Sequence, residues 1–109
     1  MEIETYKELA MRTVNPNLDK KELLINSVMG LCGESGEEIE LVKKHLFHQH
    51  PLDKTGLIKE LGDVAWYLAE AAWALDVSLE EILIQNIEKL KKRYPEGFQK
   101  ELSIHRNED

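Results

Sequence analysis

Residues 23–47 read LLINSVMGLCGESGEEIELVKKHLF, and this stretch determines the class of fold. Its apolar side chains recur at helical spacing, so it predicts one continuous helix. Yet it contains three glycines, Gly30, Gly33 and Gly36, and four of the seven residues in 34–40 are glutamates. A glycine inside a helix costs about 1 kcal/mol relative to alanine. The glycines and acids therefore point to close packing or to chemistry rather than to helix stability.

The rest of the chain predicts three further helices and no strands. It has no alternating Val/Ile/Thr runs bounded by Asn-Gly or Gly-Gly turns. An N-terminal helix should end at Asn15–Asn17, because the residue before a proline is pushed out of helical geometry. Asp19 with Glu22 has the spacing of a capping box at a helix start, and Ser78 with Glu81 repeats it. We expect a helix and turn over 1–18, helices over about 19–48, 54–75 and 78–93, and a loose polar tail over 99–109.

Chain length and charge limit the kind of protein. With 109 residues the chain is a single domain. Antiparallel helices joined by short loops make it an all-α bundle of about four helices. Because so small a domain leaves apolar surface uncovered, we expect oligomerisation to complete the bundle. The 14 basic and 21 acidic residues give a net charge of −7, which argues against binding to a nucleic-acid polymer.

The sequence predicts neither a membrane span nor a disulfide. Its most apolar run, Val64–Val77, is interrupted by Glu70 and Asp76 and is too short to cross a bilayer. The acidic N-terminus does not resemble a signal peptide. The one cysteine, Cys32, cannot form an internal disulfide. We expect a cytoplasmic protein without a membrane partner.

Two pairs of carboxylates lie on successive predicted helices. Glu34 and Glu37 are three residues apart and share a helix face, and Glu38 flanks them. Glu60 and Asp63 repeat this spacing on the next helix. A single such pair is most often solvated surface, but an antiparallel hairpin can bring two pairs level. Four carboxylates that close repel one another, and a divalent cation removes the repulsion. Oxygen ligands suit Mg²⁺, Mn²⁺ or Ca²⁺.

The side of helix 54–75 opposite these acids carries leucines and a valine that we expect in the core. The expected core residues are Leu61, Val64, Leu68 and Leu75.

Glycines lie next to the acids on both helices. Gly30 and Gly33 precede Glu34, and Gly62 lies between Glu60 and Asp63. The missing side chains of these glycines leave space for a close second helix, for a flat ligand, or for both.

The fourth predicted helix carries cations at the border of an apolar stripe. Asn86, Lys89 and Arg93 follow i, i+3, i+7 spacing and share one face. Arginine offers a fork for phosphate oxygens and lysine a point charge. In the alternative interpretation, their stems only cover apolar surface while the charged heads face water. The neighbouring stripe consists of Leu79, Leu83, Ile87, Leu90 and Tyr94.

Three segments together resemble the MazG-like nucleoside triphosphate pyrophosphohydrolases. They are GESGEEIE (33–40), KELGDVAWYLAEAAWALDVSLEEI (59–82) and NIEKLKKRYPEGF (86–98), and the resemblance covers roughly residues 23–98. The family pattern is an ExxE helix followed by an ExxD helix, and here 22 residues separate Glu37 from Glu60. The resemblance implies an all-α fold, Mg²⁺ dependence with Mn²⁺ as a substitute, and assembly as a homodimer or homotetramer. It also implies hydrolysis of a nucleoside triphosphate, deoxy and non-standard ones included, to a monophosphate and pyrophosphate.

The resemblance also assigns roles to residues. The implied metal ligands are Glu34, Glu37, Glu60 and Asp63, and the residues expected to reach the phosphates are Asn86, Lys89 and Arg93. Beside the ligands, Glu38 is our candidate to orient or deprotonate the attacking water, and Glu37 is its rival. Trp66 and Tyr67 follow Asp63 by three and four residues and can stack on the base. Alternatively, both rings belong to the core or to a dimer interface.

Other kinds of site fit the sequence less well. His45, His48 and His50 lie at a helix end next to a proline loop, where histidine is common without a metal. Di-iron bundle proteins use Glu-x-x-His pairs, and no histidine here has a glutamate three residues before it. The main alternative to an enzyme is a non-catalytic helical module that binds a nucleotide or metal or promotes oligomerisation. Turnover of a triphosphate distinguishes the two.

Overall fold

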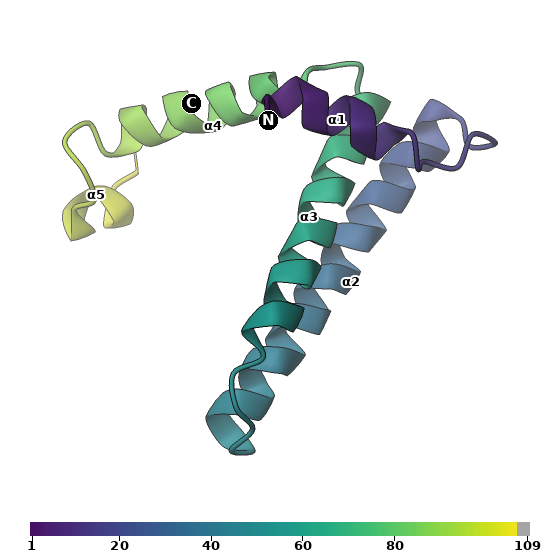
Figure 1. The fold of residues 1–109 in the computed structure, drawn as a ribbon. Helices are drawn as coiled ribbons and strands as arrows, with labels where there is room; N and C mark the ends of the chain where they lie inside the picture. The colour runs from purple at the N-terminus through teal and green to yellow at the C-terminus, as the bar shows by residue number, and fades with distance from the viewer. Residues whose placement is uncertain (107–109) are drawn as a thin grey trace.

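The computed structural model describes residues 1–106, and regular secondary structure in this part of the chain is entirely helical (Figure 1). This confirms the all-α prediction. Apart from the helices, an isolated β-bridge joins Pro95 and Gly97. The helices are α1 (Ile3–Met11), α2 (Lys20–Phe47), α3 (Lys54–Ala74), α4 (Leu79–Arg93) and α5 (Lys100–Ile104).

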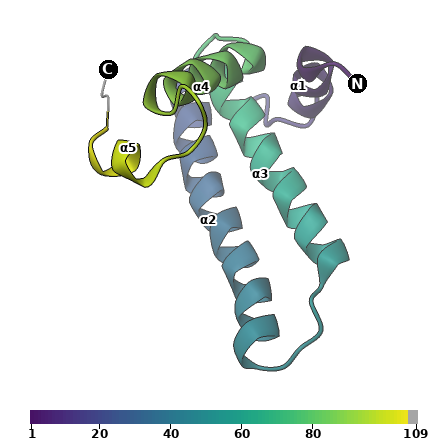
Figure 2. The ribbon, with the colours of Figure 1, turned by 90° about the vertical axis from the view of Figure 1, so that its left-hand side faces the viewer.

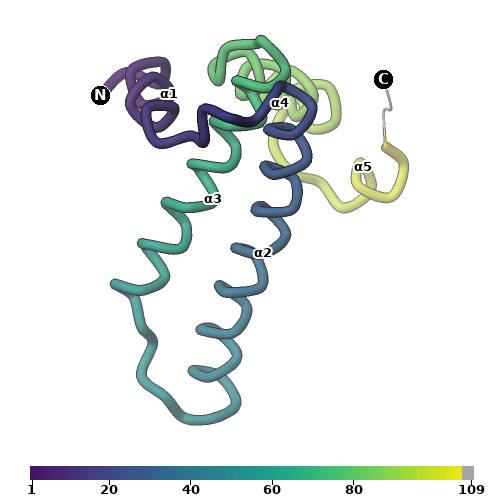
Figure 3. The backbone as a smooth tube through the Cα atoms, turned by 90° about the vertical axis from the view of Figure 1, so that its right-hand side faces the viewer, coloured from purple at the N-terminus to yellow at the C-terminus, as the bar shows by residue number. Residues whose placement is uncertain are grey.

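The two longest helices, α2 and α3, form an antiparallel hairpin, as Figures 1 and 3 show. The loop over residues 48–53 closes one end of the hairpin. At the other end α1 packs on the hairpin, and α4 leaves it as an arm that carries α5 at its far end (Figures 1 and 2). In a single chain, then, the helices do not close into a four-helix bundle, and much of the hairpin stays uncovered.

Local signals at the helix starts are largely confirmed. The Asp19 carboxylate accepts a hydrogen bond from the Glu22 amide at 2.8 Å, and Glu22 returns one to the Asp19 amide at 3.0 Å. Ser78 Oγ likewise accepts from the Glu81 amide at 3.0 Å. The second capping box is incomplete, however, because the Glu81 carboxylate accepts instead from Gln85 Nε2 at 2.7 Å.

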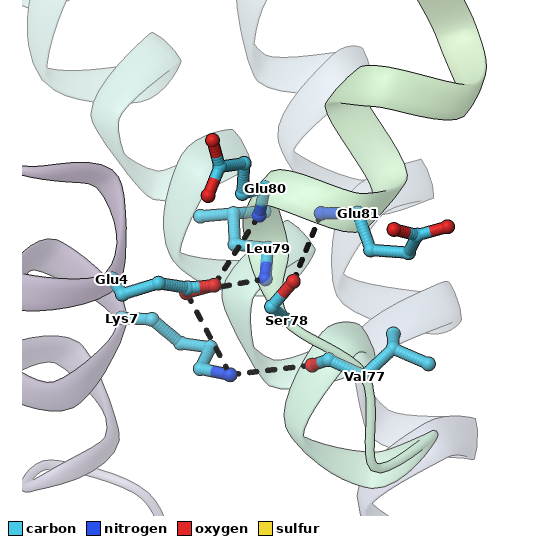
Figure 4. A network of polar contacts seen from close by, with 7 residues as sticks. All are labelled: Glu4, Lys7, Val77, Ser78, Leu79, Glu80 and Glu81. Atoms are coloured by element: carbon cyan, nitrogen blue, oxygen red, sulfur yellow. Dashed lines mark hydrogen bonds and ion pairs between the residues drawn. The ribbon is translucent and has the colours of Figure 1, made fainter.

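A carboxylate from α1 completes the start of α4 (Figure 4). The two oxygens of Glu4 accept hydrogen bonds from the backbone amides of Leu79 and Glu80, each at 3.3 Å. Lys7 Nζ donates to the Val77 carbonyl at 3.2 Å and pairs with Glu4 at 3.8 Å. Since the first amides of a helix have no partner within it and attract negative charge, these contacts fix α1 against the start of the arm.

The hydrophobic core lies where α1, α3 and the start of α4 meet. Its buried members are Ala10, Met11, Ala69, Ala72 and Leu79. The Trp66 ring packs against this cluster, and its Nε1 donates to the Ala10 carbonyl at 3.1 Å and to Thr13 Oγ1 at 2.8 Å. The core is therefore concentrated at the end of the hairpin opposite the loop.

The expected core face of α3 was partly wrong. Leu61 and Leu75 are 52% and 53% exposed, whereas Ala69, Ala72 and Glu70 are fully buried. Small side chains let neighbouring helices approach closely, so α3 turns its alanines inward. Leu68 packs against the core as expected and Val64 is half-buried, whereas Leu61 and Leu75 are exposed within a single chain.

The apolar stripe of α4 is also mostly exposed. Leu79 is buried at the junction with α1, but Leu83, Ile87 and Leu90 are each more than a third exposed. The arm loses its neighbours as it leaves the hairpin (Figure 1). The stripe therefore offers apolar surface to another molecule.

The segment expected to be a loose tail instead contains α5, over Lys100–Ile104. The last three residues of that expectation, 107–109, lie outside the described part of the chain. Among residues 1–106, none of the helices has the length and apolar character needed to cross a membrane.

Candidate metal centre

The hairpin brings together three of the predicted carboxylates. Glu34 of α2 faces Glu60 and Asp63 of α3, and one oxygen from each lies within 4.8 Å of the other two. Glu34 and Glu60 are half-buried, while Asp63 is exposed. Within residues 1–106, no other group of three or more His, Cys, Asp or Glu side chains is placed to share an ion.

The electrostatics of this cluster favour a cation. Glu34 Oε2 is buried and has no hydrogen-bond partner among the described residues. The largest influence on the Glu34 carboxyl is the hydrogen bond that its protonated form shares with Glu60, followed by desolvation and the charges of Glu60, Asp63 and Glu37. Together they raise the pKa of Glu34 to about 7. A buried acceptor without a donor beside two further carboxylates is a set of oxygen ligands suited to a hard divalent cation.

The two other predicted acids of α2, Glu37 and Glu38, are not among the three converging carboxylates. Glu37 is exposed, and its negative charge contributes to the raised pKa of Glu34, but its oxygens are not among the three that converge. Glu38 is half-buried and lines an open apolar hollow of about 390 Å³ with Ile39, Val42, Lys43, Leu46 and Phe47. The roles of Glu37 as ligand and of either residue as base stay predictions.

The two aromatic residues proposed to stack on a base are engaged within the chain. Trp66 is held by α1 through its Nε1, and the Tyr67 ring meets it edge to face with 5.1 Å between ring centroids. Tyr67 also lies over Gly30 of α2, where an added Cβ would overlap the ring. This position corresponds to the alternative interpretation of both rings as packing residues, and base stacking stays a prediction.

The glycines of the opening stretch therefore differ in what they accommodate. Gly30 allows the close approach of the Tyr67 ring, so it serves helix packing. A Cβ at Gly33 or Gly62 would have no neighbour within 4 Å. These two positions flank the carboxylate cluster in sequence, and the space beside them is open in a single chain.

The predicted phosphate-binding residues lie on the α4 arm. Asn86 and Lys89 line a hollow of about 520 Å³ at the base of the arm, together with Leu75, Val77, Glu81, Ile82 and Gln85. Arg93 is half-buried and is the last residue of α4. Because the arm runs away from the hairpin (Figures 1 and 2), a single chain does not bring these cations to the carboxylate cluster.

One polar pair of the hairpin was missed in the sequence. Glu70, noted only as a charge that interrupts an apolar run, is completely buried. Asn26 Nδ2 donates to both of its carboxylate oxygens, at 3.0 and 2.9 Å. Burial raises the pKa of Glu70, and the hydrogen bond from Asn26 partly opposes that rise. The available signal was a glutamate among the small residues of 69–72, the face that α3 buries.

The histidines near the hairpin loop are not grouped as three side chains placed to share an ion. Nδ1 of His45 lies 2.9 Å from the His50 carbonyl oxygen. This contact closes the end of α2.

Comparisons with known proteins identify the family. The model of the MazG nucleotide pyrophosphohydrolase domain matches residues 24–98. The "Gene 37 protein" of Mycobacterium phage L5 is 41% identical over 88 residues, which cover 72% of this chain and 73% of the phage protein. No solved structure matches the chain significantly. The matched region contains the complete carboxylate cluster and all of α4, and the chain belongs to the MazG nucleotide pyrophosphohydrolase family.

Proposed function

We propose that the protein hydrolyses a nucleoside triphosphate, deoxy or non-standard ones included, to a nucleoside monophosphate and pyrophosphate. The reaction would depend on Mg²⁺, with Mn²⁺ as a substitute, and would take place in the cytoplasm. The observation that carries this proposal is the convergence of Glu34, Glu60 and Asp63 within a chain of the MazG family.

The three carboxylates fit a cation of this kind. All the atoms that would ligate the ion are carboxylate oxygens, and one of them is buried without a hydrogen-bond partner among residues 1–106. One oxygen from each residue lies within 4.8 Å of the other two, close enough for one ion to contact all three. Glu34, Glu60 and Asp63 would hold the ion, with Glu37 one turn further along α2 as a fourth ligand. A bound divalent cation supplies charge neutralisation at the phosphate oxygens and a lower pKa for bound water.

The other residues have separate tasks in this proposal. Glu38, or Glu37 in its place, takes the proton of the water that attacks phosphorus. The bond between the α- and β-phosphates breaks, and its electron pair leaves with the pyrophosphate. Lys89 and Arg93 stabilise the charge on that leaving group, and Asn86 donates a hydrogen bond to it. Trp66 and Tyr67 border the space for the base.

We propose further that a homodimer or homotetramer completes the site. Large apolar side chains are exposed on the hairpin and on the arm, among them Met29, Phe47, Ile58 and Ile87, and exposure of this kind marks interaction surfaces. The cations of α4 lie apart from the carboxylates of their own chain. The α4 arm of a neighbouring copy therefore brings Lys89 and Arg93 to this chain's acids.

The test is turnover by purified protein. We expect pyrophosphate release from one or more triphosphates of a panel that includes deoxy and oxidised bases, measured by anion-exchange chromatography with and without Mg²⁺. Glu60→Gln and Asp63→Asn should abolish release while the circular dichroism spectrum stays that of the parent. Glu8→Gln, at an exposed position on α1, is the matched control and should release pyrophosphate like the parent.

The shared site has its own test. We expect Glu60→Gln and Arg93→Met each to be inactive alone and to regain activity when mixed and reassembled, because one intact site then forms between the two chains. Absence of recovery in the mixed assembly would contradict a cation supplied by the neighbour. Size-exclusion chromatography with light scattering gives the number of chains.

The separation of α4 cations from the acids within one chain also favours a second candidate, a non-catalytic module that binds a metal or nucleotide. Such a module would bind Mg²⁺ and release no pyrophosphate from any triphosphate of the panel. Its carboxamide variants would simply gain stability as repulsion among the carboxylates is relieved.

A further inference from the structure

The contact between α2 and α3 consists of successive layers that use different chemistry. Moving toward the loop, the layers pair Asn26 with Glu70, Gly30 with Tyr67, and Glu34 with Asp63. The α2 members are spaced by four residues and the α3 members by three and four, so one face of each helix provides all of them. A polar layer, a notch filled by a ring and the carboxylate cluster thus form one continuous seam.

The polar layer and the carboxylate cluster are connected by simple helix geometry. Glu34 lies eight residues beyond Asn26, about 12 Å of axial rise, and Asp63 lies seven residues before Glu70, about 10.5 Å. In an antiparallel hairpin these two displacements run in the same direction. The carboxylates therefore come level because Asn26 and Glu70 are level.

A slide of α2 along α3 by one helical turn, about 5.4 Å, would break the Asn26–Glu70 and Gly30–Tyr67 layers. Glu70 would then face either Glu22 or Gly30, and neither side chain can donate a hydrogen bond to a buried carboxylate. Burying a carboxylate without a partner is strongly unfavourable. The same slide would move the Tyr67 ring off the notch and draw Glu34 away from Asp63.

Apart from these layers and the contacts of Lys20 with Trp73 and Asp76, the buried packing of α3 discriminates poorly between registers. The remaining buried side chains of α3 are alanines, which pack almost equally well one turn up or down. Specific pairing of buried polar groups is a known means of selecting one register among several. Within residues 1–106, the contact of Asn26 with the buried Glu70 is one of the side-chain hydrogen bonds that join α2 to α3. Lys20 Nζ, at the exposed start of α2, also donates to the Trp73 carbonyl at 2.9 Å.

We propose that Asn26 and Glu70 are positioning residues, which fix the register of α2 against α3 and thereby hold Glu34 opposite Glu60 and Asp63. This inference rests on the proposed function of those carboxylates as a cation site. Neither residue belongs to the carboxylate cluster or to the α4 face assigned to phosphate. Their effect on a bound cation is exerted through the placement of Glu34.

The test compares cation affinity with folding stability in matched variants. Asn26→Leu combined with Glu70→Leu replaces the pair by apolar side chains, and such replacements are often neutral or stabilising. We expect this double variant to unfold at the parent's temperature or above. Its Mn²⁺ dissociation constant, measured by electron paramagnetic resonance, should rise at least tenfold, the size seen when support for metal ligands is removed.

Rescue distinguishes positioning from a general loss of structure. Glu70→Gln keeps an acceptor for the Asn26 amide and should bind Mn²⁺ within about threefold of the parent. The double variant Asn26→Glu, Glu70→Asn places the same two side chains on the opposite helices and should also bind Mn²⁺ within about threefold of the parent. If the apolar double variant does not fold, Mn²⁺ binding by these two variants still tests whether the pair positions Glu34. Loss of Mn²⁺ binding in both, with folding intact, would overturn the proposal, as would parent-like affinity in the apolar variant.

A distance measurement keeps the inference separate from the proposed activity. Spin labels on Cys32, exposed on α2, and on a cysteine replacing exposed Lys59 of α3 report the register directly. Labelled chains are diluted with unlabelled ones so that only distances within a chain are seen. We expect one narrow distance in the parent and a broadened or shifted distribution in the apolar variant; an unchanged narrow distance would refute the register role. A parent that binds Mn²⁺ but hydrolyses no triphosphate would remove the proposed function and leave this result standing.

Discussion

Replacement of Asn26 by alanine tests the energetics of its contact with the buried Glu70, since Asn26 itself is exposed. Asn26 Nδ2 lies 3.0 and 2.9 Å from the two oxygens of a carboxylate with 0% exposure. One amide group makes both contacts, so we count them as a single hydrogen bond to a charged group, worth about 1.5–3 kcal/mol. The stability lost in Asn26→Ala has an upper limit, because Glu70 can take up a proton instead of staying charged without its partner. Protonating a carboxyl group with the ordinary pKa of 4.5 at pH 7, which is 2.5 units higher, costs about 3.4 kcal/mol.

The expected cost at pH 7 is therefore about 1.5–3 kcal/mol of unfolding free energy. For a chain of this size, this corresponds to a fall in Tm of roughly 6–12 °C. Near pH 4.5 a larger share of Glu70 is protonated in the folded state. The cost should then approach that of a neutral hydrogen bond, about 0.5–1.5 kcal/mol.

The sign of the pH dependence follows from the raised pKa of Glu70. The folded state binds this proton more tightly than the unfolded state, so the free energy of unfolding falls as pH rises from about 4.5 to the folded pKa and is constant above it. Loss of the Asn26 amide removes the influence that lowers the pKa. The decline should therefore continue to higher pH in Asn26→Ala, while Glu70→Gln should lack this contribution.

Urea titrations followed by circular dichroism at pH 4.5 and 7.5 measure these differences. The matched control is Gln85→Ala, which removes a similar amide–carboxylate contact, 2.7 Å from Glu81 but exposed. Exposed pairs on helices contribute about 0.2–0.5 kcal/mol. If Asn26→Ala costs no more than this control, or the same at both pH values, Asn26 does not stabilise the buried charge of Glu70.

Three further predictions concern the cluster, the glycines and the arm. Without a cation, the raised pKa of Glu34, about 7, makes the free energy of unfolding fall as pH rises from about 4.5 to 7. Glu60→Gln should reduce this pH dependence and shift the titration of the Glu34 carboxyl, followed by carbon-13 NMR, to lower pH. An unshifted titration would contradict the coupling between Glu34 and Glu60. Gly30→Ala should destabilise the protein by about 1–3 kcal/mol, because the added Cβ overlaps the Tyr67 ring. Gly33→Ala has open space around it and should stabilise the protein by up to about 1 kcal/mol, measured by thermal unfolding. Equal effects of the two substitutions would refute the difference between the two glycines. Glu4→Ala should cost about 0.5–2 kcal/mol and speed hydrogen exchange at the first amides of α4, and unchanged exchange there would show that the arm is fixed by other contacts.

Part of the candidate site could be predicted because its spacing is local. Glu34 was placed correctly opposite Glu60 and Asp63. Each helix puts residues three apart on one face, and the short connection between the helices forces them to be antiparallel. Glu37 has the same spacing, yet it is exposed and its oxygens are not among the three that converge.

Other features depended on contacts between residues far apart in the chain. Asn26 and Glu70 are 44 residues apart, and Glu4 and Leu79 are 75 apart. Nothing near either residue in the sequence indicates its partner. The leucines of α3 illustrate the same limit, since Leu61 and Leu75 mark an apolar stripe but not whether another helix covers it.

The sequence by itself determined the four longer helices, the starts of α2 and α4, and the spacing of the acids along each helix, but neither the end of α1 at Met11 nor α5. These properties arise from contacts within about four residues, such as the capping box of Asp19 and Glu22. Only the tertiary structure decided the register of the hairpin, the burial of Glu70 and the direction of the α4 arm. Each of these depends on which surfaces meet, and the free energy of burying a charge or an apolar stripe is set by the neighbour it meets rather than by its own residue type.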